Sequence, residues 1–273
     1  FGALDFNYPS PEIETEILES VRGKDLYIFH HPLSAVAECV RSIRTNILFM
    51  SPDRDVKRLL VTSPGPQEGK TTLCLNLAIA MAQSGSRILV VDTDLRRPRV
   101  HKAFGLANDK GVTSVLLGVH SIDEAVQRTV VENLDVLACG PIPPNPSELI
   151  HTERFAELVE SLSSRYDKII FDSPPVTAVT DAAILIHHVD GAVLILRPLV
   201  THKNAARQAK RAIEDVSGRI LGVVFNDLDL ENREYRYYHY YYYRKHGYYY
   251  GEAKAGDRGE AGKPDGEQRP VEL

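Results

Sequence analysis

The stretch SPGPQEGKTT, residues 63–72, lies between an apolar run and a long helical pattern. VKRLLVTS (56–63) is typical of a buried strand, and GKTTLCLNLAIAMAQSG (69–85) of a helix that ends at a glycine. A loop in this context that closes with Gly-Lys-Thr predicts a phosphate-binding loop, in which backbone amides and the helix N-terminus cradle an anion. We expect Lys70 to reach the β- and γ-phosphates and Thr71 to hold Mg²⁺ through its hydroxyl.

One position of this loop departs from the usual G-x-x-x-x-G-K pattern. Pro64 stands where the first glycine is expected, and Gly65 supplies flexibility one residue later. The plainer alternative is an ordinary strand-to-helix turn with an incidental lysine. We favour a nucleotide site, formed by Gly65, Pro66, Gln67, Glu68, Gly69, Lys70, Thr71 and Thr72.

The alternation of apolar runs and helical patterns continues along the chain. Further strands are expected at 87–94, 133–139, 167–175, 191–198 and 219–227, and helices at 34–50, 147–166, 181–189 and 202–216. Apolar runs separated by helices predict a mostly parallel sheet with helices on both faces. The expected fold class is α/β, of the P-loop NTPase type.

Acidic residues stand at the ends of two further expected strands. Asp92 and Asp94 are two residues apart and therefore point to the same side of their strand, and Asp172 ends a later strand in the manner of a Walker-B acid. Ligands of open α/β sheets bind at the carboxyl ends of the strands. Each acid alone could cap a turn or a helix, but together with the loop they predict a site for a nucleotide and Mg²⁺.

The segment FNDLD (225–229) bears on the choice of base. It approximates the guanine-reading pattern N-K-x-D, but Asp227 occupies the place of the lysine. We therefore favour adenine and place Asn226 near the base, the alternative being an asparagine that merely ends a strand.

Composition limits the function classes. The chain has 273 residues, of which 43% are hydrophobic and 25% charged, and a net charge of −5 argues against polyanion binding by the whole molecule. Its cysteines, Cys39, Cys74 and Cys139, show no disulfide or zinc spacing, which favours a reducing, cytosolic compartment. No signal peptide and no apolar run of the ~18 residues needed to cross a bilayer is visible. Because the chain starts without methionine, we expect it to be a fragment of a longer protein whose remainder has room for membrane segments.

The C-terminal region is unusual. EYRYYHYYYYRKHGYYYGE (234–252) contains ten of the 13 tyrosines, in runs that fit neither helix nor strand periodicity. Residues 251–273 contain almost no large apolar side chains, which predicts disorder. We divide the chain into a linker with a short helix near 11–21 (1–33), a P-loop domain (34–230), and a flexible tyrosine cluster with a disordered tail (231–273).

These features together resemble the bacterial tyrosine kinases, the cytoplasmic kinase domains of polysaccharide co-polymerases that control capsule and exopolysaccharide chain length. The resemblance rests on the tyrosine cluster and on ECVRSIRTNILF (38–49), SPGPQEGKTT (63–72), ILVVDTDLRRP (88–98), LACGPIPPNPSELI (137–150) and IIFDSPP (169–175). The related partitioning and division-site ATPases carry a signature lysine where this chain has Gly65, which favours the kinase branch.

The resemblance implies an ATP- and Mg²⁺-dependent protein-tyrosine kinase that phosphorylates its own tyrosine cluster in trans. It implies catalytic roles for Lys70, Asp92 and Asp94, and metal binding by Thr71, Asp94 and Asp172. The implied phosphorylation sites are Tyr235, Tyr237, Tyr238, Tyr240, Tyr241, Tyr242, Tyr243, Tyr248, Tyr249 and Tyr250. We expect Asp92 to accept the proton of the incoming phenol, although the sequence does not order the roles of Asp92 and Asp94.

The resemblance also implies partners and a location. Glu38, Arg41 and Arg44 match an E-x-x-R-x-x-R oligomerisation motif, whereas the residues alone suggest an exposed ion pair of small energy. The implied partners are further copies in a ring, octameric by resemblance, a membrane co-polymerase segment in cis or in trans, and a cognate protein-tyrosine phosphatase. The expected location is the inner face of the cell membrane.

Two other functions compete with this one. A non-kinase P-loop ATPase of the partitioning or division-site type would position partners at the membrane as a regulator and use the tyrosines as a docking surface. Alternatively, the tyrosines interleaved with Arg236, Arg244 and Lys245 could stack on RNA bases, and the basic run 94–102 could form a nucleic-acid patch. We expect no nucleic-acid partner, because a solvated loop or a nucleotide-facing surface explains the basic run.

Overall fold

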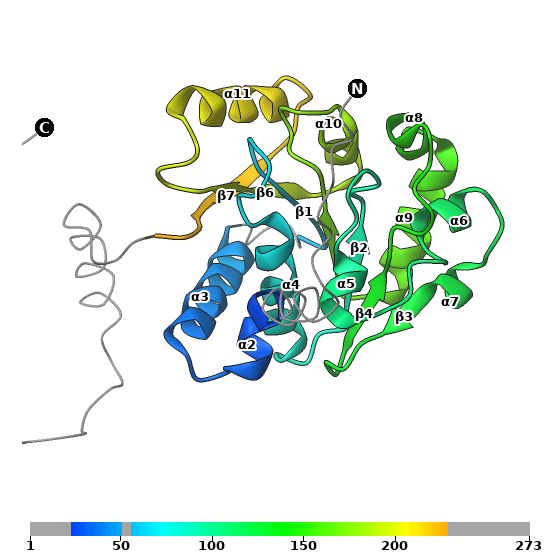
Figure 1. Ribbon diagram of the computed structural model, residues 1–273, viewed down its shortest axis with the longest axis horizontal. Coiled ribbons are helices and arrows are strands. Elements are labelled where there is room, and N and C mark those ends of the chain that lie inside the picture. Colours follow the sequence, from blue (N-terminus) through cyan, green and yellow to red (C-terminus); the bar gives the residue numbers. More distant parts are fainter. Residues whose placement is uncertain (1–22, 51–55, 229–273) are drawn as a thin grey trace, which may run out of the picture. The chain divides into compact units, whose positions relative to one another are not determined.

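A computed structural model describes residues 23–50 and 56–228 (Figure 1). The expected helix near 11–21, the tyrosine cluster and the C-terminal tail lie outside these residues. Within them, the strands form one sheet in the order β3-β4-β2-β5-β1-β6-β7. All neighbouring strands run parallel except β3 and β4. The strands are β1 Arg58–Thr62, β2 Ile88–Asp92, β3 Val126–Arg128, β4 Leu134–Leu137, β5 Lys168–Asp172, β6 Gly191–Leu196 and β7 Ile220–Phe225.

Helices cover both faces of this sheet, so the expected α/β class is confirmed. Successive strand residues alternate between two apolar clusters, as Leu59 and Val61 join one and Leu60 the other. The first cluster includes side chains from α2 (Tyr27–His30), α3 (Ala35–Phe49), α4 (Lys70–Ala82) and α5 (Val100–Phe104). The second includes side chains from α6 (Val112–Leu116), α8 (Pro146–Ile150), α9 (Glu153–Arg165), α10 (Asp181–Leu185) and α11 (Lys203–Glu214).

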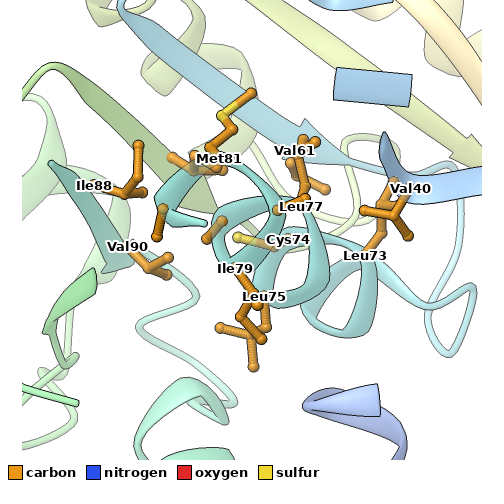
Figure 2. Close-up of a cluster of buried hydrophobic side chains, with 14 of the residues drawn as sticks. Val40, Val61, Leu73, Cys74, Leu75, Leu77, Ile79, Met81, Ile88 and Val90 are labelled. Carbon is orange, nitrogen blue, oxygen red and sulfur yellow. The ribbon is translucent and has the colours of Figure 1, made fainter. Parts of the chain in front are cut away.

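Helix α4, which follows the phosphate-binding loop, lies at the centre of the first cluster. Nearly all of its residues are buried, because α2 and α3 cover it on the side away from the sheet. Figure 2 shows Leu77 and Met81 of this helix among Val61, Ile88 and Val90 of the strands. A helix that is apolar all round belongs in a core. Its first turn, and with it the loop, is therefore held on a rigid element.

The structure differs from the expected elements mainly between residues 95 and 166. The helix expected at 147–166 is two helices, because Thr152 caps α9 by accepting a hydrogen bond from the amide of Phe155. The segment between β2 and β4 holds α5, α6, α7 (Ile122–Ala125) and the antiparallel edge strand β3. Each of these has only three to five residues, too few to show a periodic pattern.

Two smaller findings complete the fold. The helix expected at 181–189 ends earlier, as α10 is followed by a 3₁₀ turn at Ile186–His188. Helix α2, within the expected linker, packs with its fully buried Ile28 against α4. Among the helices of the described ranges, none combines the length and apolar character needed to cross a membrane.

Candidate nucleotide-binding and catalytic site

The phosphate-binding loop connects β1 to α4 and depends on a glycine immediately before the helix. Gly69 has φ of 95° and forms the N-cap of α4, a backbone conformation that favours glycine. A Cβ atom on Gly69 would lie 2.1 Å from Nδ2 of Asn226. That Nδ2 donates a hydrogen bond to the carbonyl of Glu68 at 3.0 Å. Asn226, expected near the base, thus holds the backbone of the loop from the end of β7.

Glu68 braces the loop from within. Its side chain is buried, and its Oε2 accepts a hydrogen bond from the amide of Gly65 at 3.0 Å while Oε1 accepts one from Thr201 Oγ1. The Pro64 carbonyl accepts a hydrogen bond from Thr177 Oγ1 at 2.6 Å. Loops after β5 and β6 therefore pin the segment in which Pro64 replaces the usual glycine. Sequence reasoning placed Glu68 at the nucleotide but missed this bracing, because Thr201 is distant in the chain.

Lys70 and Thr71 begin α4 and face the acidic residues. Lys70 is buried, and its pKa is lowered by that burial, an effect opposed by the charges of Asp172, Asp94 and Glu68. Thr71 Oγ1 donates a hydrogen bond to Asp172 Oδ2 at 2.6 Å. The structure thus brings the loop lysine, the loop threonine and the Walker-B acid together, as expected from the sequence.

Asp92 and Asp172 are direct register partners across β2 and β5, and both are buried. Asp92 Oδ2 accepts hydrogen bonds at 3.0 Å from the amides of Arg99 and Val100 at the start of α5. In the described part of the chain, Oδ1 of Asp92 and Oδ1 of Asp172 have no hydrogen-bond partner. A buried carboxylate oxygen without a partner is costly, so both atoms suit a cation or a donor from a ligand.

Asp94 lies on the same edge but is half-exposed. Its Oδ1 accepts hydrogen bonds from the amides of Arg96 and Arg97 at 3.3 and 3.0 Å. The two aspartates of the motif therefore have different surroundings, since Asp92 is covered whereas Asp94 is accessible from solvent.

Arg96 secures the loop that carries Asp94. Its Nε and Nη2 bind both carboxylate oxygens of the buried Asp181 at 2.8 and 3.0 Å, and Nη2 also donates to Ser147 Oγ. Ser147 Oγ in turn donates to Asp181 Oδ1 at 2.5 Å. This network joins the loop after β2 to α8 and α10. The expectation that the basic run is a solvated loop or a nucleotide-facing surface did not include this bidentate pair, because its acid lies far along the chain.

Burial changes the proton affinity of the paired acids. It raises the pKa of Asp172 to about 7, with contributions in the same direction from Asp94 and Asp25, while Thr71 and Lys70 lower it. Burial likewise raises the pKa of Asp92 well above its usual range, and the charge of Asp172 adds to the effect. Positive charge brought to this edge would favour the ionised forms of both groups.

The donor set fits a hard divalent cation. Thr71 and Asp172 supply oxygen atoms, and Asp94 supplies a further carboxylate on the same edge. No group of three or more His, Cys, Asp or Glu side chains within the described ranges is arranged to hold a metal. Mg²⁺ at nucleotide sites commonly uses one or two carboxylates and takes further oxygens from phosphates and water, which agrees with so few protein ligands.

The expected oligomerisation residues lie on α3. Glu38 Oε2 pairs with Arg41 Nε at 2.9 Å, and Arg41 Nη2 donates to the Pro32 carbonyl. Arg44 Nη1 donates to the Ala80 carbonyl near the end of α4 at 2.8 Å, whereas its buried Nε has no partner among the described residues. Both arginines thus have contacts within their own chain.

Comparisons with known proteins agree with this geometry. The AAA domain family model matches residues 67–198. The tyrosine-protein kinase YwqD of Bacillus subtilis is 46% identical over 208 residues, which cover 76% of this chain and 88% of that protein. The chain belongs to the bacterial tyrosine kinases. The putative tyrosine-protein kinase CapB of Staphylococcus aureus is 36% identical over 227 residues, 83% of this chain and 95% of CapB.

A solved structure supports the same family at the level of the fold. The crystal structure of the chimerical protein CapA2B2 has a TM-score of 0.73 and 38% identity, covering 78% of this chain and 98% of that one. This bacterial tyrosine kinase therefore has the P-loop fold of a solved relative. The non-kinase alternative is set aside, because the chain matches relatives named as tyrosine-protein kinases over most of their length.

We predict that Asp172→Asn stabilises the ligand-free kinase at pH 8 more than at pH 5. A carboxyl whose folded pKa is raised stays protonated in the folded state while the unfolded chain ionises. Stability is therefore lost as pH rises from about 4 toward about 7. The variant escapes this loss, and its advantage should grow between the two pH values by at least about 1 kcal/mol, roughly 2–4 °C in Tm.

Thermal melts without divalent metal would measure this. Phe171→Leu, a non-titrating change in the same strand, should shift Tm by the same amount at both pH values and is the matched control. An equal shift at pH 5 and pH 8 for Asp172→Asn would contradict the raised pKa.

Proposed function

We propose that this kinase transfers phosphate from ATP, with Mg²⁺, to the tyrosines between Tyr235 and Tyr250 of a neighbouring copy. The observation that carries the proposal is the meeting of Lys70, Thr71 and two buried aspartates at one sheet edge. The chain also carries a dense cluster of tyrosines, which are the acceptors that a phosphoryl-transfer site of this kind requires. Membership of the tyrosine kinases supports the choice of acceptor.

In this proposal the nucleotide phosphates lie on the loop from Gly65 to Thr72. Lys70 and the loop amides bind phosphate oxygens, and Asn226 at the end of β7, which donates to the Glu68 carbonyl of the loop, is the residue proposed to lie near the base. Thr71, Asp94 and Asp172 would hold Mg²⁺, which neutralises phosphate charge when bound. Oδ1 of Asp172 has no hydrogen-bond partner within the described ranges, which supports this assignment.

Asp92 is the proposed acceptor of the phenol proton. A phenol has a pKa near ~10 and is almost wholly protonated at neutral pH, so a nearby base assists transfer. Two amides fix Oδ2 of Asp92, and its Oδ1 has no hydrogen-bond partner among the described residues, so that oxygen is available to a phenol hydroxyl. Asp94 is the alternative acceptor, because it is the more exposed of the two.

The first prediction of this proposal is that Lys70→Met abolishes phosphotyrosine formation after incubation with ATP and Mg²⁺. Lys203→Met, at the start of α11, is the matched control and should keep full activity. An antibody against phosphotyrosine reads both.

A separate mixing experiment tests transfer between copies. The Lys70→Met chain is mixed with an active chain in which all ten cluster tyrosines are phenylalanine. Phosphotyrosine should then form on the Lys70→Met chain. If the wild-type chain alone forms phosphotyrosine but this mixture does not, transfer is restricted to within one chain. Salt-sensitive retention of RNA without any phosphotyrosine would overturn the kinase proposal in favour of RNA binding.

A second prediction separates the two aspartates. Asp92→Asn should lower the autophosphorylation rate by about 100-fold or more while affinity for Mg-ADP stays within about threefold, because general-base assistance is lost and binding is not. Asp94→Asn should instead weaken Mg-ADP binding. Full autophosphorylation by Asp92→Asn with normal affinity would exclude it as the base and favour Asp94.

We also propose that α3 joins copies into a ring, through Glu38, Arg41 and Arg44. A heterologous contact that closes on itself makes a ring in which each copy can present its tyrosines to the next site. Arg41 is partly exposed, so its guanidinium can exchange its present partners for those of a neighbour.

The corresponding prediction is that Arg41→Ala combined with Arg44→Ala gives a monomer by multi-angle light scattering. Arg165→Ala removes an exposed ion pair with Asp123 and should leave assembly unchanged. If the double variant assembles normally and melts as the wild type does, the ring contact lies elsewhere on the surface.

Phosphorylation of the cluster would act on this assembly through charge. Each phosphate adds about −1.5 to −2 charges, so a few overturn the local positive charge of Arg236, Arg244 and Lys245. A cluster so charged would leave an acidic site and weaken the ring. We propose that this cycle regulates capsule or exopolysaccharide synthesis at the inner face of the membrane, with a co-polymerase segment and a tyrosine phosphatase as partners.

A further inference from the structure

Asp25 is a fully buried acid just before α2, outside the residues assigned above. Its Oδ1 accepts a hydrogen bond from Thr72 Oγ1 at 2.5 Å. Its Oδ2 accepts one from Arg99 Nη2 at 2.7 Å. Burying a carboxylate is unfavourable unless it is paired, and here both oxygens have a partner. An apolar residue would fill the same space at lower cost, so the position of the charge calls for an explanation.

The backbone around Asp25 is also anchored, through Asn76 in the middle of α4. Asn76 Oδ1 accepts from the amide of Ile28 at 3.0 Å, and its Nδ2 donates to the carbonyl of Asp25 at 3.1 Å. Leu26 and Ile28 are buried in the first apolar cluster. The segment is thus docked by contacts that do not involve the carboxylate. The carboxylate of Asp25 instead binds Thr72 and Arg99.

Those partners belong to the two halves of the site. Thr72 follows Lys70 and Thr71 in the first turn of α4, one residue beyond the hydroxyl that binds Asp172. Arg99 donates its backbone amide to Oδ2 of Asp92 while its side chain reaches Asp25. A single carboxylate therefore links the start of α4 to the residue that orients Asp92.

We propose that Asp25 is a positioning residue that holds the first turn of α4 and the loop after β2 in one fixed relation. It does so by bridging Thr72 and Arg99 from a segment that precedes the kinase core. The inference rests on the proposed roles of Thr71 in nucleotide binding and Asp92 in transfer. It makes docking of residues 23–31 a requirement for an ordered site, so that displacing this segment would loosen both halves together.

Asp25→Asn is the direct test, because the amide keeps the size and one acceptor for Thr72 but removes the charge facing Arg99. Calorimetric titration with Mg-ADP, at a temperature where the variant is folded, should show affinity weakened by about tenfold, of the order expected for a lost charged hydrogen bond. The rate of autophosphorylation at saturating ATP should also fall, since Asp92 loses its fixed orientation.

Asp190→Asn is the matched control. Asp190 also binds an arginine side chain, Arg58, and accepts from the amides of Lys57 and Arg58, but it does so at the amino ends of β1 and β6, the opposite edge of the sheet. This variant should lower Tm while leaving Mg-ADP affinity unchanged. If Asp25→Asn lowers Tm in the same way and binds Mg-ADP with wild-type affinity, Asp25 serves only the fold and the proposal is wrong.

Variants at Arg99 keep the test decisive if Asp25→Asn folds poorly. The Arg99 side chain is about two-fifths exposed, so Arg99→Gln and Arg99→Lys are compatible with folding. Arg99→Gln should weaken Mg-ADP binding and Arg99→Lys should restore most of it. Equal binding by wild type, Arg99→Gln and Arg99→Lys would overturn the proposal. Because the readout is nucleotide affinity, these results stand apart from whether tyrosine is the acceptor.

Discussion

Asp92 and Asp172 are buried side by side in register at the carboxyl ends of β2 and β5. The rest of the site depends on this placement. Parallel pairing of two central strands brings the acids together, and the cover of helices on both faces excludes water from them. Burial raises the pKa of each, and each keeps one carboxylate oxygen without a hydrogen-bond partner among the described residues. The fold thus places two buried carboxyl groups, each with one oxygen available to a cation or a ligand donor, next to Lys70 and Thr71.

The other buried acids near this edge behave differently. Glu68 braces the phosphate-binding loop, Asp181 holds Arg96, and Asp25 joins Thr72 to Arg99. All three have donors for both carboxylate oxygens, so they stiffen the loops on which the reacting groups stand. The acids with two hydrogen-bonded oxygens therefore position the site. Asp92 and Asp172, each with one oxygen that lacks a partner among the described residues, remain available for binding and proton transfer. Such preorganisation is what phosphoryl transfer needs, because alignment and charge neutralisation supply most of its catalysis.

Sequence reasoning predicted the sheet, the loop and the acidic edge, because each has a local signature. Each signature lies within ten residues of sequence: an apolar strand that ends in aspartate, or a Gly-Lys-Thr that precedes an apolar helix. It missed α5, α6, α7 and β3, which are too short for periodicity, and the break at Thr152, where a threonine cap outweighs helical propensity. It also missed the bracing roles of Glu68, Arg96 and Asp25, since their partners lie far along the chain and meet only through the fold.

The most direct test of this account is the titration of the two buried acids themselves. Carbon-13 labelling of aspartate carboxyls in the ligand-free kinase, followed by NMR between pH 4 and 9, would report the macroscopic behaviour of the pair. The account predicts that two carboxyl resonances, assigned by Asp92→Asn and Asp172→Asn, both titrate well above the usual range of an aspartate, and that the Asp172 resonance does so at about pH 7. It further predicts that Mg-ADP moves them to lower pH. Two resonances already fully ionised at pH 5 without ligand would contradict it.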